Sequence, residues 1–463
     1  MCVTKGEFMA FEAAVDSIDI TPEFPPYPSL WMGGYGWDRR GNHGVVARRL
    51  RAHCLVIWDN DVPKVLLRAD LVSVPRDVHQ TIRGTLVDEG LIAENDLIIL
   101  ASHTHSGALY GDTRPSPFII MGLNDQDIDA VNGTAFLITD ALIQLVRDTL
   151  DQERKEVTLS YAEGEANIGF NRVGLDTVLN TVPVLRVDTV DDELFAVVFG
   201  AACHPVSRGK DDVFDGEFPA VAAELIEDEL GVPALFVQGA CGDQEAHDPH
   251  IPATTDLIGG ILGREVVHLV DEADFTPLTG PIGTALVEID LPFNVDTSKP
   301  SVRAMLREKY QARHDSLNPL DVDWRHADVM LKLIDDGDLP TSIPMPIQRW
   351  NLGGLSILAL AHEPLSAYHV RLRKMFPGNL WVMGYANECE AYVADNDTLR
   401  SGGNLHGGYE AGWNDGDDTI AGSGCWTMSY AWPSPLKFSS GFEGGPGTAE
   451  RLVIDTCKGL LGL

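Results

Sequence analysis

The chain has 463 residues, 44% of them hydrophobic, which is enough for a large buried core. Its formal net charge is −35, because 69 Asp and Glu outnumber 34 Lys and Arg. Such a field repels phosphate backbones and anionic membrane surfaces, so we expect no nucleic-acid partner and no stable membrane association. No uncharged apolar run reaches the roughly 18 residues that would span a bilayer.

The N-terminal segment and the cysteines indicate in which cellular compartment the protein is located. The first 23 residues carry Lys5, Glu7, Glu12 and Asp16 and lack the apolar stretch of a signal peptide. The 7 cysteines are odd in number and form no CxxC pair, which is typical of reduced thiols. We therefore expect a cytoplasmic protein.

Short β-rich runs alternate with helical stretches along the chain. Predicted strands are Cys54–Trp58, Val65–Arg68, Leu97–Ala101, Val157–Tyr161, Val184–Val187, Ala196–Phe199, Ala234–Val237, Ala285–Ile289, Leu355–Ala359 and Leu380–Met383. Predicted helices are Arg76–Glu89, Ala130–Leu150, Pro219–Leu230, Ser301–Asp336 with a break, and Gly447–Leu461. This alternation predicts an α/β fold, with a mixed, largely parallel sheet covered by helices. No linker is evident, so we expect a single domain over residues 1–463.

Several predicted strands run directly into polar residues capable of chemistry. Histidines, carboxylates and a tyrosine follow five of them: His103 and His105, His204, Asp243, Glu363, and Asn387 with Tyr392. In open α/β sheets the carboxyl ends of strands form the crevice where ligands bind. We therefore expect these side chains to converge on one site at the strand ends.

Residue types and spacing favour a metal at that site. His103 and His105 are two apart, so in extended backbone both point the same way. Imidazole nitrogen and carboxylate oxygen are ligands of Zn²⁺. Each residue alone leaves an alternative open: a polar strand end for the two histidines, a structural role for His204, and an arginine salt bridge for Glu363.

Several segments resemble, in order along the chain, motifs of the neutral, non-lysosomal ceramidases. They are Asp19–Pro22, Ser102–Gly107 (like THTHSG), Cys203–Ser207, Glu217-Phe218-Pro219, Phe236–Asp243 (like FVQGxxGD), Ala361–Pro364, and Ala386-Asn387 with Tyr392 and Tyr409-Glu410. The resemblance covers nearly the whole chain and corresponds to the N-terminal catalytic domain of that family. We expect no counterpart of that family's C-terminal immunoglobulin-like domain.

The resemblance also implies roles for individual residues. It implies a Zn²⁺ held by His103, His204, Glu363 and Tyr392. It further implies that His105, Arg172 and Tyr409 support the metal ligands or the transition state.

The departures from the family pattern concern the substrate-facing positions. Glu245 stands where ceramidases carry a serine that has been assigned a nucleophilic or substrate-binding role. His362 replaces the family's glycine, and Cys389 replaces a frequent second tyrosine. The metal set is retained while the substrate-facing set is not, which favours a retained mechanism on a different substrate.

We therefore predict a zinc-dependent hydrolase that cleaves the C–N bond of a linear amide in a small polar molecule. Activated water would be the nucleophile, with His105, Arg172, Tyr409 and Glu245 as the catalytic residues. Two alternatives stay open: an ester, lactone or glycoside hydrolase with the same metal site, and a non-catalytic binding protein with this fold. A homo-oligomer is also left open.

Overall fold

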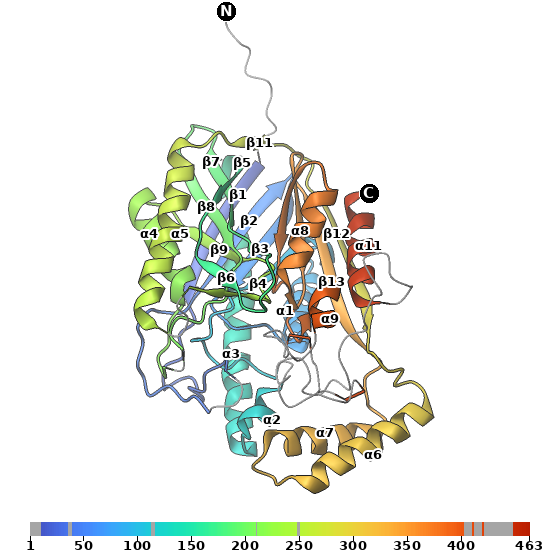
Figure 1. Cartoon of the computed structure of the whole chain (residues 1–463). Coiled ribbons are helices and arrows are strands. Elements are labelled where there is room, and N and C mark those ends of the chain that lie inside the picture. The colour runs from blue at the N-terminus through green and yellow to red at the C-terminus, as the bar shows by residue number, and fades with distance from the viewer. Residues whose placement is uncertain are drawn as a thin grey trace, which may run out of the picture.

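The computed structural model describes residues 11–35, 39–112, 116–209, 211–247, 251–401, 410–411, 419–420 and 448–463. Two stacked sheets form the centre of the protein, with helices on both outer faces (Figure 1). Figure 1 shows α4 and α5 on one side and α8 and α11 on the other. Tyr409 lies outside the described residues, so the structure does not place it.

The larger sheet has nine strands. Its order is β4-β3-β2-β1-β5-β7-β8-β9, and β11 pairs with β5. Its strands are β1 (Phe11–Asp19), β2 (Arg51–Asp59), β3 (Val62–Ala69), β4 (Leu97–Ala101), β5 (Lys155–Glu165), β7 (Thr181–Thr189), β8 (Leu194–Ala201), β9 (Ala234–Gln238) and β11 (Thr276–Leu278).

The smaller sheet has four strands in the order β12-β13-β14-β16, and two strand pairs lie apart from both sheets. The four strands are β12 (Gly283–Pro292), β13 (Ser342–Asn351), β14 (Leu355–Leu360) and β16 (Asn379–Met383). The separate pairs are β6 (Gly169–Asn171) with β10 (Gln244–Ala246), and β15 (Glu363–Pro364) with β17 (Tyr392–Val393).

Helices cover the outer faces and one end of the molecule. They are α1 (Arg76–Asp88), α2 (Pro117–Met121), α3 (Asp125–Leu150), α4 (Glu217–Leu230), α5 (Pro252–Glu272), α6 (Pro300–Ser316), α7 (Val322–Asp336), α8 (Ser366–Met375), α9 (Asn396–Ser401) and α11 (Ala449–Leu461), with a short 3₁₀ turn, η1 (Glu94–Asp96). The α6–α7 hairpin lies beside α2 (Figure 1), where Arg325 donates hydrogen bonds to the carbonyls of Ile119 and Ile120.

Strand β2 shows why two sheets stack. Cys54 and Val56 pack in the cluster that includes α3, whereas Leu55 and Ile57 pack in the cluster that includes the smaller sheet. Successive side chains of a strand point to opposite faces, so a strand that is apolar at every position must be covered on both faces. Helices cover one face of the large sheet, and the second sheet covers the other.

The expected mixed α/β sheet is confirmed, but its largely parallel character is wrong. Only β3 with β4, β8 with β9, and β14 with β16 pair in parallel among the strands of the two large sheets that the structure describes. The other pairs are antiparallel because many connections are short turns, such as residues 60–61 between β2 and β3. Parallel strands need a crossover of a dozen or more residues, which such turns do not provide.

The large sheet is also strongly curled. β4 and β9 stand at opposite ends of its hydrogen-bonding order, yet they contact each other. The segment after β16 lies across both of them, through bridges between Leu100 and Ala386 and between Gly239 and Met383. The curl therefore brings strand ends that are distant in the sheet order to one place.

Candidate metal site

Three histidines at strand ends of the curled sheet form the centre of the candidate site. His103 and His105 follow β4, and His204 follows β8. All three are buried, and their candidate ligand nitrogens lie within 4.8 Å of one another. Their approach follows from the curl of the sheet, since β4 and β8 are not neighbours in its order.

Backbone carbonyls orient two of these rings. His103 Nδ1 lies 2.6 Å from the carbonyl of Val72, and His204 Nδ1 lies 2.9 Å from those of Cys241 and Gln244. A carbonyl oxygen only accepts, so each Nδ1 carries the proton and each Nε2 presents its lone pair to the site. His105 differs, because its Nδ1 has no hydrogen-bond partner among the described residues.

Burial keeps the histidines neutral. It lowers the pKa of His103 to about 4, and it lowers the pKa values of His105 and His204 well below their usual range. A metal ligand must be the neutral imidazole. His103 also adopts a φ of 65°, which is uncommon outside glycine and typical of functional sites.

Glu363 and Tyr392 lie in the segments that follow β14 and β16 of the smaller sheet. Their short strands, β15 and β17, pair in parallel with these two residues opposite each other. Glu363 Oε2 lies 3.5 Å from His103 Nε2 and 3.4 Å from His204 Nε2, and the Tyr392 hydroxyl lies 3.4 Å from His204 Nε2. The carboxylate therefore faces histidines, where an arginine salt bridge was the alternative.

These separations suit a zinc ion. Ligands about 2.0–2.1 Å from a tetrahedral centre are about 3.3–3.4 Å apart, close to the distances observed here. His105 Nε2 also lies 3.3 Å from His103 Nε2, so the three histidines form a second possible ligand set. The residues present therefore fit the metal that the sequence motifs imply.

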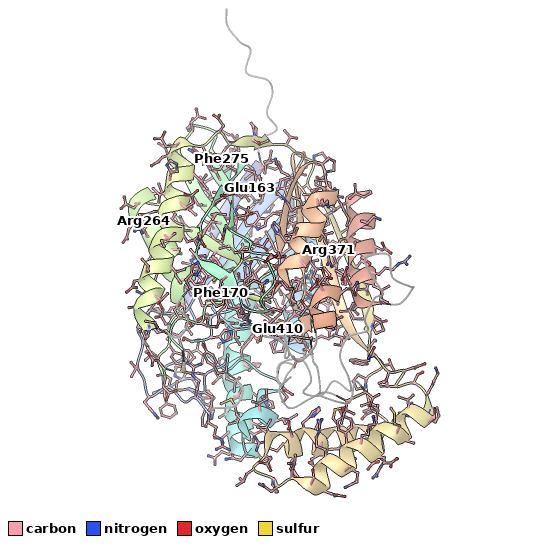
Figure 2. All side chains as sticks on the ribbon, in the orientation of Figure 1. Glu163, Phe170, Arg264, Phe275, Arg371 and Glu410 are labelled. Atoms are coloured by element: carbon pink, nitrogen blue, oxygen red, sulfur yellow. The ribbon has the colours of Figure 1, made fainter. Side chains whose placement is uncertain are left out.

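Arg172 lies beside these residues and contacts one of them. It follows β6, and its guanidinium donates to the Tyr392 hydroxyl at 3.0 Å, to the Gly242 carbonyl at 3.0 Å, and to Glu410 Oε1 at 2.8 Å. Glu410 is fully buried. Figure 2 labels Glu410 and Phe170, both in the central part of that view. The cation thus lies next to the tyrosine oxygen that faces His204.

Glu245 belongs to the same region. It forms a parallel bridge with His204 and stands opposite Phe170 in the β6–β10 pair. Its neighbour Gln244 is buried, whereas Glu245 is partly exposed and Phe170 is 37% exposed. Because opposed residues of paired strands share a face, Glu245 and Phe170 lie side by side toward solvent. The structure thus brings together the predicted metal ligands, His105, Arg172 and Glu245, and Tyr409 lies outside the described residues. The side chains of Asp243 and Asn387, also expected at the site, bond elsewhere: Asp243 to Asn171 and Ser366, and Asn387 to Arg83 and Gln348.

A glycine-rich loop covers His105. A Cβ added to Gly34, whose φ is +105°, would lie 2.9 Å or less from three atoms of His105, so only glycine fits here. The Tyr35 ring contacts the His105 ring at 4.9 Å, and Arg40 donates to the His105 carbonyl at 2.7 Å. The aromatic, glycine-rich composition of residues 31–37 was the only sequence signal for this contact.

Two further groups near the site carried no predicted role. Glu217, at the start of α4, is fully buried and accepts hydrogen bonds from the Ser106 hydroxyl at 3.1 Å and the Ser207 amide at 2.6 Å. Burial and the neighbouring Asp215 raise the pKa of Glu217 to about 8. The other is Tyr385, whose ring lies 4.2 Å from that of His103.

Comparison with known proteins agrees with the architecture. No protein-family model and no curated protein matches the sequence. The neutral ceramidase from Pseudomonas aeruginosa superposes with a TM-score of 0.65 and 17% identity, covering 85% of this chain and 70% of that one. A ceramidase complexed with C2 gives a TM-score of 0.64 and 16% identity, covering 85% and 71%. The chain therefore has the neutral-ceramidase fold, and the resemblance seen in the motifs is confirmed at that level.

None of the helices in the described part of the chain has the length and apolar character needed to cross a bilayer.

Proposed function

We propose that this protein is a zinc-dependent hydrolase that cleaves the C–N bond of a linear amide in a small polar substrate. The main support is the pair of buried, neutral histidines, His103 and His204, whose Nε2 atoms face the Glu363 carboxylate at 3.4–3.5 Å. The ceramidase fold adds to this, because the two similar structures are enzymes named for cleaving ceramide.

The donor set suits metal-assisted hydrolysis. Zinc bound by such residues lowers the pKa of a bound water to about 7 and polarises a carbonyl group. His103, His204, Glu363 and Tyr392 would hold the ion. Arg172 donates to the Tyr392 oxygen and so holds it beside His204.

His105 is the proposed proton-transfer residue. Carbonyls fix the protons of His103 and His204 on Nδ1, whereas no described group holds the Nδ1 of His105. Its ring is thus the one of the three whose tautomer is not set by a hydrogen bond to a backbone carbonyl among the described residues. Arg172 and Tyr409 would donate to the developing oxyanion, each lowering the barrier by about 2–4 kcal/mol.

Glu245 sets the class of substrate in this proposal. Its partly exposed carboxylate stands at the site, next to Phe170, at the position where ceramidases carry a serine. A carboxylate there suits a substrate with an ammonium or hydroxyl group better than a neutral lipid amide. We propose that the substrate is met in the cytoplasm, consistent with the unpaired state of the five described cysteines.

The proposal is tested by metal analysis and a substrate panel. We expect about one Zn²⁺ per chain and hydrolysis of small polar amides rather than of esters, lactones or glycosides. Single-turnover reaction in ¹⁸O-water should label the product directly. Label in the Glu245 side chain would contradict direct attack by water. Binding to anionic vesicles at physiological salt would contradict a soluble polar substrate.

A further inference from the structure

Tyr385 is a buried tyrosine that no sequence motif singled out. It follows β16 and is 1% exposed. Its φ is 54°, a conformation that costs a bulky side chain free energy and persists only where surrounding contacts hold it.

The Tyr385 hydroxyl contacts the carboxylate at the centre of the site. It donates a hydrogen bond to Glu363 Oε2 at 3.2 Å. The same oxygen lies 3.5 Å from His103 Nε2 and 3.4 Å from His204 Nε2. The Tyr385 ring packs on the His103 ring, with centroids 4.2 Å apart and planes tilted by 36°. One side chain thus contacts two of the candidate ligands.

Cys241 connects this tyrosine to the third candidate ligand. Its thiol donates to the Tyr385 hydroxyl at 3.2 Å, and its carbonyl accepts from His204 Nδ1 at 2.9 Å. Cys241 follows β9 of the large sheet, whereas Tyr385 and Glu363 follow strands of the smaller sheet. The contact therefore joins the two halves of the site.

Tyr385 and Tyr392 have different environments. Tyr392 accepts a hydrogen bond from the Arg172 cation, whereas Tyr385 lies among a carboxylate and a thiol. Tyr385 thus donates to Glu363, while the Tyr392 hydroxyl lies between the Arg172 cation and His204 Nε2.

We propose that Tyr385 is a positioning residue of the metal site: its hydroxyl fixes Glu363 Oε2 against the two histidines, and Cys241 in turn orients that hydroxyl. This inference rests on the proposed metal-dependent function. Groups that orient metal ligands typically change metal affinity about 10- to 100-fold when removed. The ligands themselves would remain intact.

The test is the zinc affinity of Tyr385→Phe, measured by competition with a chromophoric chelator. The phenylalanine ring keeps the packing on His103 and removes only the hydroxyl. We expect the Kd for zinc to rise about 10- to 100-fold. Tyr110→Phe is the matched control, because it also removes a buried hydroxyl, one bonded to Thr139 at 2.7 Å. Its Kd should stay within about twofold of wild type.

A double-mutant cycle tests the part played by Cys241. Cys241→Ala alone should weaken zinc binding about threefold, and it should have little further effect in Tyr385→Phe, because both changes disrupt one chain of hydrogen bonds. Equal effects in both backgrounds would overturn this part of the proposal.

The outcomes separate the positioning role from simpler explanations. If Tyr385→Phe lowers the Tm of the metal-free protein but leaves the zinc Kd unchanged, Tyr385 is only a core residue and the inference is wrong. If wild-type protein takes up no zinc, the proposed function fails instead. Zinc uptake by wild type together with an unchanged Kd in the variant would overturn the positioning role alone.

Discussion

Glu363 Oε2 lies 3.4 Å from His204 Nε2, although the two residues follow strands of different sheets. A largely buried carboxylate and a buried neutral imidazole whose Nδ1 carries the proton present two acceptors to each other, which is unfavourable unless a cation or a shared proton lies between them. This contact is the basis of the first prediction.

Replacement of His204 should empty the metal site. We expect His204→Ala to lose zinc and hydrolytic activity, because it removes an Nε2 that faces Glu363 and whose ring is fixed through Nδ1 by two backbone carbonyls. Metal content by mass spectrometry checks this. His314→Ala, on the distant α6–α7 hairpin, is the control and should keep its zinc. Full occupancy in His204→Ala would remove this residue from the site.

Removal of the Glu245 charge should change substrate preference. Glu245→Gln should lower kcat/KM for amides with an ammonium group about 10-fold or more, while neutral amides change less, because only the former lose an ionic contact. Zinc content should stay at the wild-type level. Glu193→Gln, at an exposed turn, is the matched charge control. Equal losses for charged and neutral substrates would show that Glu245 does not select for charge.

Arg172 should affect both stability and activity, and the two effects can be separated. Arg172→Ala leaves the buried Glu410 without this ion pair, which should cost about 3–5 kcal/mol of unfolding free energy. Adding Glu410→Gln should restore much of the stability, measured by urea unfolding. The double variant should stay inactive if the guanidinium acts on substrate. Recovered activity would assign Arg172 a structural role only.

Glu217 should make stability depend on pH. Its pKa is raised to about 8 in the folded protein, whereas an unfolded glutamate titrates near 4.5. Between these values the folded state holds the extra proton, so unfolding free energy should fall as pH rises through this window. Glu217→Gln keeps the size of the group and cannot ionise, so its profile should be flatter between about pH 5 and 8. Glu156→Gln, exposed on β5, should keep the wild-type slope.

The sequence by itself determined most elements, and it supplied the site residues that the proposed function uses. Apolar runs ending in histidine, as at His103 and His204, mark strand ends, and all ten predicted strands lie within or coincide with observed ones. The missed elements lacked such patterns. β13 contains Pro344 and Pro346, which suggest a break, yet their missing N–H groups lie where β14 has already ended, and both carbonyls still accept hydrogen bonds.

Only the tertiary structure decided how those residues meet. The sequence of a single strand does not reveal whether helices or a second sheet cover its apolar faces, because burial against either partner is equally favourable. The curl that brings β4 to β9 depends on twist summed over the whole sheet, which no local pattern encodes. Tyr385 shows the consequence: its hydroxyl contacts the Cys241 thiol only because a strand of the smaller sheet lies across both edges of the larger one.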